Sequence, residues 1–115
     1  MTRQRLPNRR MNASQAIEVD GQTCTACVGF NRLGQPREIF LSGNKEGSAL
    51  DALLADAAVV ISIALQHGIP ASALAKSIGR LPGVPVGPRD LDKPARQPAS
   101  LIGAALDLLR DFEQI

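Results

Sequence analysis

The chain has no tryptophan and no tyrosine, and its only aromatic residues are Phe30, Phe40 and Phe112. A core within these 115 residues must therefore consist mainly of aliphatic side chains, and the length supports one domain. A single thin aliphatic core leaves apolar surface that self-association can bury. We therefore expect a homo-oligomer.

The sequence also lacks a strong excess of charge and a long apolar run, and we expect no secretory leader. A formal net charge of +2 is too small to indicate nucleic-acid binding, so we expect no DNA partner. No continuous apolar run approaches the roughly 20 residues of a membrane span. The basic start MTRQRLPNRR is not followed by the apolar stretch of a signal peptide. These features predict a cytoplasmic protein that does not contact a membrane.

Cysteine is scarce, and the two cysteines present form a C-x-x-C spacing at Cys24 and Cys27 within TCTACVGF (23–30). A redox or zinc site needs both sulfurs to converge, whereas residues i and i+3 of a strand face opposite sides. Zinc also needs two further ligands, and the chain offers only His67 and scattered carboxylates. We interpret the cysteines as small apolar strand residues and expect no metal and no cofactor. A C-x-x-C redox carrier stays open as a third functional hypothesis.

The segments around TCTACVGF predict a short antiparallel meander. QAIEV (15–19) ends at Asp20-Gly21, which is the strongest two-residue signal for a hairpin. A turn at 31–36 then leads into a third strand, REIFL (37–41). Residues 1–14 are polar and basic, and we assign them to an extended arm ahead of one domain spanning 15–115.

The longest predicted helix covers residues 48–67. Ser48 suits its N-cap, Asp51 follows three residues later, and Gly68 suits its C-terminal end. Apolar residues recur along it at helical spacing. The consecutive apolar run 59–61 predicts a helix that is buried on more than one side.

Two further helices are predicted, at 70–80 and at 100–115, the latter capped by Ser100. The connection 81–98 between them contains five prolines and two glycines, which predicts an irregular segment. Strands followed by helices are typical of an α+β fold. We expect a three-stranded meander with the helices packed on one face.

The segment GNKEG before Ser48 is the best candidate for binding a phosphate. Gly43 and Gly47 allow backbone amides to turn inward, Lys45 adds positive charge, and the helix N-terminus adds its dipole. A Walker A motif is excluded because the final Gly-Lys-Ser/Thr is missing. The predicted phosphate site contains Gly43, Asn44, Lys45, Gly47 and Ser48. An ordinary strand-to-helix turn with a solvated lysine is the alternative.

Arg5, Arg9 and Arg10 in the N-terminal arm add to this candidate site. Their guanidinium groups suit bidentate phosphate contacts on their own protomer or on a neighbouring one. The alternative is a solubilising, disordered arm. We predict no catalytic residue, since His67 suits a helix end and no base-and-orienter pattern accompanies Ser48 or Ser62.

Three stretches carry a family resemblance: RLPNRR (5–10), the segment 38–80 that contains EIFLSGNKEGS and ISIALQHGIP, and ASLIGAALDLL (99–109). The chain resembles the TSCPD domain at the C-terminus of vitamin B12-dependent ribonucleotide reductases and its short stand-alone relatives. Only residues 81–98 lack a counterpart. The Thr-Ser-Cys-Pro-Asp signature of that family is also missing, because its cysteine falls on Pro98 and its aspartate on Ser100.

The resemblance implies a module that works beside nucleotides and carries none of the reductase's catalytic barrel, active-site cysteines or cobalamin site. We therefore expect a non-catalytic, oligomeric binding module for a nucleotide or another phosphate-bearing ligand. In a phage, such an oligomer with basic pockets can sequester a nucleotide signal of the host's defence. The alternative is an accessory domain that docks on a ribonucleotide reductase and modulates it.

Overall fold

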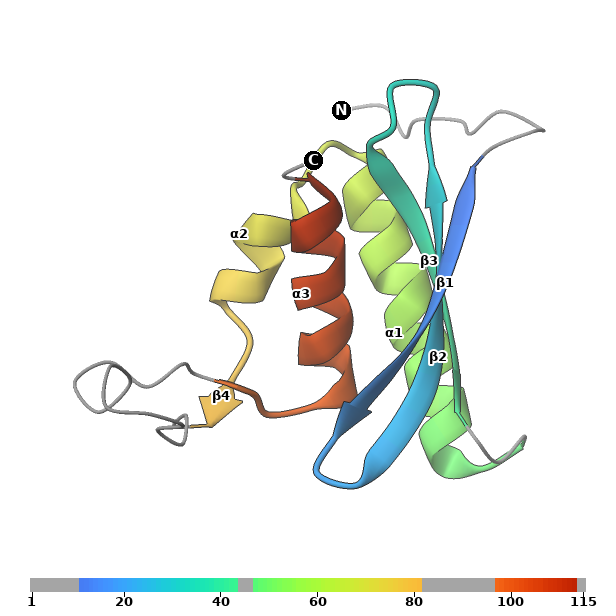
Figure 1. The fold of residues 1–115 in the computed structure, drawn as a ribbon, viewed down its shortest axis with the longest axis vertical. Coiled ribbons are helices and arrows are strands. Elements are labelled where there is room, and N and C mark those ends of the chain that lie inside the picture. The colour runs from blue at the N-terminus through green and yellow to red at the C-terminus, as the bar shows by residue number, and fades with distance from the viewer. Residues whose placement is uncertain (1–10, 44–46, 82–96, 114–115) are drawn as a thin grey trace.

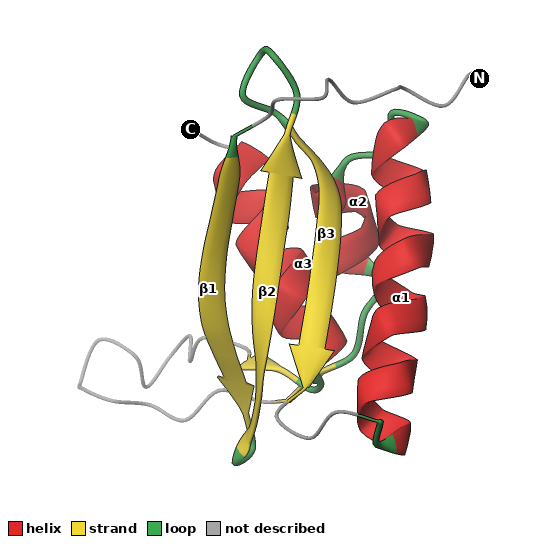
Figure 2. Cartoon of the chain, turned by 90° about the vertical axis from the view of Figure 1, so that its right-hand side faces the viewer, coloured by secondary structure: helices red, strands yellow, loops and turns green. Residues whose placement is uncertain are grey.

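The computed structural model describes residues 11–43, 47–81 and 97–113. The predicted α+β class is confirmed, because a three-stranded antiparallel sheet is followed by helices (Figure 1). The helices lie on one side of the sheet, and no described residue covers the opposite face, which points toward the viewer in Figure 2. The fold thus has one covered and one open sheet face.

The sheet has the strand order β1-β2-β3, formed by β1 (Asn12–Val19), β2 (Gln22–Phe30) and β3 (Pro36–Gly43). Asp20 and Gly21 connect β1 to β2 with φ values of 51° and 80°. Both residues lie in the left-handed region, as the tight hairpin turns matching the twist of a sheet require. The predicted hairpin is therefore confirmed, although β1 begins three residues earlier than expected and takes in part of the predicted arm.

The helices are α1 (Ala49–Gln66), α2 (Ala71–Lys76) and α3 (Leu101–Glu113). Helix α3 packs across the sheet and contacts all three strands, whereas α2 packs on α3. A short antiparallel pair, β4 (Arg80–Leu81) with β5 (Gln97–Pro98), joins the two ends of the predicted irregular connection. The sequence patterns did not predict this pair, and the residues between its strands lie outside the described part of the chain.

The core is aliphatic, as the composition requires. It lies between the inward-facing residues of the sheet, one side of α1 and the apolar side of α3. Phe30 and Phe112 meet in it edge to face, with ring centroids 5.1 Å apart. Its largest fully buried side chains include Val28, Ile39, Leu54, Leu65, Leu106 and Leu109.

Helix α1 closes the β3 edge of the sheet through side chains that bind the strand backbone. The Ser62 hydroxyl accepts the N–H of Ile39 at 2.9 Å and donates to the carbonyl oxygen of the same residue at 3.1 Å. Gln66 donates to the carbonyl oxygen of Arg37 at 3.2 Å. The edge groups of a strand need partners when they are buried, and α1 supplies them in place of a fourth strand.

The prediction that α1 is buried on more than one side is wrong for the single chain. Its buried residues occupy one side, and the other side exposes Leu53, Val59, Val60 and Ile63, with Val60 68% exposed. The apolar run 59–61 winds around the helix, so only Ile61 reaches the core. Apolar periodicity indicates burial but does not say whether the same chain provides the cover.

Candidate functional site

The start of α1, where the sequence predicts a phosphate site, is organised around Asp51. Its carboxylate accepts the N–H of Gly43 at 2.9 Å and that of Gly47 at 3.4 Å. The Ser48 hydroxyl in turn accepts the N–H of Asp51 at 3.1 Å, which confirms Ser48 as the N-cap. The two glycine amides that were expected to face a phosphate therefore bind a carboxylate of the chain itself.

The rest of that predicted site lies outside the described residues: Arg5, Arg9, Arg10, Asn44 and Lys45. Whether they bind a phosphate stays a prediction. The sheet nevertheless constrains which residues of one chain can share this site. Met11, which follows the arm, lies at the end of the sheet opposite Gly43. Met11 is about 20 Å along the strand direction from the level of Gly43, estimated from six residues at about 3.3 Å each.

A polar hollow of about 470 Å³ lies at the Met11 end of the sheet. The turn before β3 and the connection between α1 and α2 form its walls, and Phe112 and Glu113 of α3 line it. Arg37 donates from its guanidinium to the carbonyl oxygen of Pro36 and to Oε1 of Gln35, both at 2.9 Å. These bonds hold a cationic group in the wall of the hollow.

The hydrogen bonds of two side chains, Asn31 and Glu113, also shape this hollow. Asn31 accepts the N–H groups of Leu33 and Gln35 at 3.0 Å each and so holds the turn. The carboxylate of Glu113 accepts the N–H groups of Ala71 and Ser72 at 2.7 and 3.1 Å, which ties the end of α3 to the start of α2. The lining of the hollow therefore combines a cation, a carboxylate that already accepts two N–H groups, an amide and an aromatic ring.

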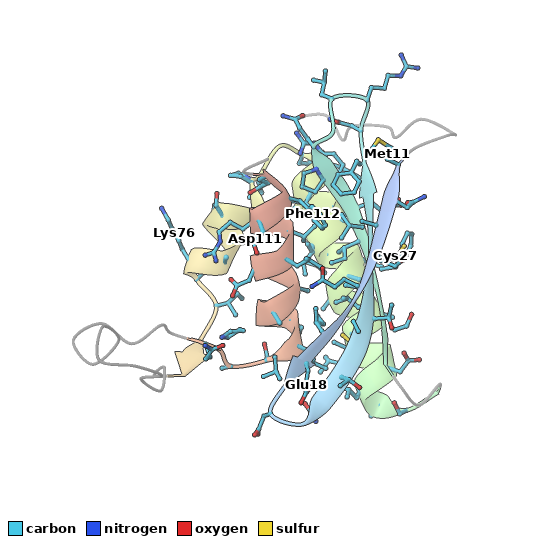
Figure 3. The ribbon with its side chains drawn as sticks, viewed as in Figure 1. Met11, Glu18, Cys27, Lys76, Asp111 and Phe112 are labelled. Atoms are coloured by element: carbon cyan, nitrogen blue, oxygen red, sulfur yellow. The ribbon has the colours of Figure 1, made fainter. Side chains whose placement is uncertain are left out.

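The prediction that the two cysteines of the C-x-x-C spacing are strand residues is confirmed. Cys24 and Cys27 lie in β2, where Cys24 is 1% exposed in the core and Cys27 is half-buried. Figure 3 shows Cys27 on the side of the sheet that faces away from the helices. Burial raises the pKa of the Cys24 thiol, which disfavours the reactive thiolate.

His67 forms the C-terminal cap of α1, where the sequence placed it, and its backbone N–H bonds to carbonyl oxygens of the last turn. Within the described residues, no group of three or more His, Cys, Asp and Glu side chains is arranged to hold a metal ion. The positions of the missing signature have structural roles. Ser100 accepts the N–H of Gly103 at 3.0 Å, and a Cβ atom on Gly103 would lie 3.1 Å from Pro98 Cβ.

The exposed side of α1 is flanked by two apolar grooves. One, of about 360 Å³, lies between α1 and the α2–α3 pair and includes Val60 and Ile102. The other, of about 340 Å³, lies between α1 and the open face of β3 and includes Phe40 and Val59.

By length and composition alone, α1 is the one helix in the described ranges that can cross a membrane. Its polar side chains instead bind the edge of the sheet.

Comparison with known protein families and proteins agrees with the resemblance seen in the sequence. The family model of the TSCPD domain matches residues 2–110, so the chain belongs to the TSCPD domain family. No solved structure matches the chain.

Similar proteins of named function are vitamin B12-dependent ribonucleotide reductases. The one from Rhodopirellula baltica is 29% identical over 85 residues, which cover 74% of this chain and 8% of that relative. Those from Agrobacterium fabrum and Bradyrhizobium diazoefficiens are 38% and 34% identical over 68 residues, which cover 59% of this chain and 5% of each relative. The chain therefore corresponds to one small part of these enzymes and is a ribonucleotide reductase-related domain.

Sequence reasoning missed both the hollow and the role of Asp51. The hollow is lined by both Arg37 and Phe112, which are far apart in the sequence, and no local motif signals that they come together. Asp51 carried a local signal, the N-cap spacing from Ser48, but that spacing did not reveal the bonds back to Gly43 and Gly47.

Proposed function

We propose that this chain is a non-catalytic, oligomeric binding module for a nucleotide or another phosphate-bearing ligand. The observation that carries the proposal is the polar hollow lined by Gln35, Arg37 and Phe112. Its volume of about 470 Å³ lies within the range of small-molecule sites, roughly 300–1,000 Å³. A guanidinium suits a phosphate, an amide suits the edge of a base, and an aromatic ring suits its face.

The basic arm supports the same proposal. Met11 lies next to the end of β2, because its carbonyl oxygen accepts the N–H of Phe30 at 3.0 Å. The chain segment that contains Arg5, Arg9 and Arg10 therefore joins the domain at the end of the sheet that carries the hollow. An oligomer of such modules sequesters a nucleotide by binding it without reaction, and a phage protein that removes a nucleotide signal of its host's defence works in this way.

Calorimetric titration of the full chain with linear and cyclic nucleotides tests the proposal. Arg37→Gln removes the cation of the hollow, and Arg32→Gln in the turn before β3 is a matched control, since Arg32 is exposed and does not line the hollow. Lys45→Gln tests the segment before α1. We expect Arg37→Gln to weaken binding by about tenfold or more. Absence of nucleotide binding at sub-millimolar concentrations contradicts the proposal.

A second candidate function is supported by the exposed apolar side of α1 and by the named relatives. In this alternative the chain is an accessory domain that docks on a ribonucleotide reductase through Leu53, Val60 and Ile63. Co-elution with the purified reductase of the same genome tests it. Val60→Asp should abolish co-elution, whereas Thr25→Asp on the open sheet face serves as a control. A chain that never co-elutes with the reductase rules this alternative out.

A further inference from the structure

The β1 edge of the sheet is open, in contrast to the β3 edge. The carbonyl oxygen of Met11 bonds to Phe30, so the odd-numbered residues of β1 direct their backbone groups toward β2. The even-numbered residues direct theirs away from the sheet. No hydrogen bond from another described residue reaches the backbone of Ser14, Ala16 or Glu18 on that side. Figure 2 shows no strand or helix beyond this edge.

This edge also lacks the features by which proteins keep a free strand from pairing. Such features include a short length, a proline, a bulge or a lysine in the strand. β1 has eight residues, contains neither proline nor lysine, and carries a single charge at Glu18. The irregular register at Gly29 and Phe30 concerns the pairing of β2 with β3. The open edge is therefore suited to accept another strand.

We propose that the occupant is a second copy of this chain, whose β1 pairs antiparallel with β1 and places Gln15 on the two-fold axis. This inference names the interface of the oligomer and rests on the self-association in the proposed function. Ser14 then exchanges backbone hydrogen bonds with Ala16 of the second copy, and the sheet continues through both copies.

The side chains of β1 are self-complementary in this register. On the helix-covered face, Ala13 lies opposite Ile17 of the second copy, and Met11 lies opposite Val19. Met11 is 72% exposed in the single chain, so the pairing gives this side chain an apolar neighbour. On the open face no charges of like sign are opposed. A shift by two residues would instead place Gln15 opposite the buried Ile17, which favours the register centred on Gln15.

The pairing has a consequence for the predicted phosphate site. Met11 of one copy comes to the level of Val19 of the other, at the end of the sheet marked by Glu18 in Figure 3. Gly43 of that copy lies at the same end. Along the strand direction, Met11 is therefore nearer to Gly43 of its partner than to Gly43 of its own copy.

Charge substitutions at Gln15 test this register, because Gln15 is exposed and its replacement leaves the core intact. Gln15→Lys and Gln15→Glu each place like charges opposite one another and should raise the dissociation constant of the dimer about threefold to tenfold. An equimolar mixture of the two variants should restore wild-type affinity. Gln22→Lys, at the start of β2, is a matched control that should leave the affinity unchanged. Sedimentation velocity provides the measurement.

A second variant, Ala16→Pro, removes an N–H donor from the open edge without removing a hydrogen bond within the chain. It should weaken the dimer by about 100-fold or more and leave the circular dichroism spectrum unchanged. An oligomer that withstands the Gln15 variants contradicts the β1 pairing and leaves the proposed function standing. A wild-type chain that is monomeric at about 100 µM contradicts both.

Discussion

The two edges of the sheet differ in whether their outward-facing backbone groups have hydrogen-bond partners. At β3, α1 runs along the strand, and Ser62 and Gln66 bind its backbone groups. At β1, the backbone groups of Ser14 and Ala16 receive no partner among the described residues. One edge is closed by the chain itself, and the other is available for assembly. A small domain with a thin aliphatic core can in this way restrict association to one edge of its sheet.

The largest expected effect comes from opening the closed edge. Ser62→Ala removes the partner of both the N–H and the carbonyl oxygen of Ile39, which are buried. Each orphaned group costs about 1–3 kcal/mol, so we expect the free energy of unfolding to fall by roughly 2–6 kcal/mol. Chemical denaturation measures this change. Ser14→Ala on the open edge is the matched control and should change stability by less than about 0.5 kcal/mol. Equal effects at the two serines would remove the distinction between the edges.

A smaller effect is expected at the start of α1. Asp51→Asn keeps the shape of the side chain but replaces charged acceptors for the Gly43 and Gly47 amides. We expect a loss of about 1 kcal/mol, since a charged group near a helix N-terminus is also lost. Asp56→Asn, one turn further along the exposed side, is the control and should have little effect. The result contradicts the assigned role of Asp51 if the two variants unfold at the same denaturant concentration.

Much of the fold was predictable because its signals are local. The left-handed pair Asp20-Gly21 predicts the hairpin, and the spacing of Ser48 and Asp51 predicts the start of α1. The closing of the β3 edge by α1 was harder to predict from the sequence. Ser62 interrupts an apolar run in the sequence, and only its position along β3 shows that this hydroxyl binds the strand.

The candidate site was predicted less well than the fold. The glycine segment before α1 showed the chemistry of an anion site, but the sequence did not reveal that Asp51 already binds its amides. The hollow around Arg37 depends on contacts between the β3 turn and the end of α3. Such contacts form only when the chain folds, and no periodicity or spacing in the sequence reports them.

The smallest expected effect concerns the central strand, which pairs with both edge strands. Burial raises the pKa of Cys24 above its ordinary value of 9.0, so the folded state disfavours the thiolate relative to the unfolded state. This contribution to stability is fully present below about pH 9, where the thiol is protonated in both states. It is lost as the pH rises through the pKa of the folded state. The free energy of unfolding of the wild type should therefore decline as the pH rises above about 9. Cys24→Ala should flatten the decline, whereas Cys27→Ala on the open face should not. An unchanged slope in Cys24→Ala would show that the buried thiol does not set the alkaline stability of the sheet.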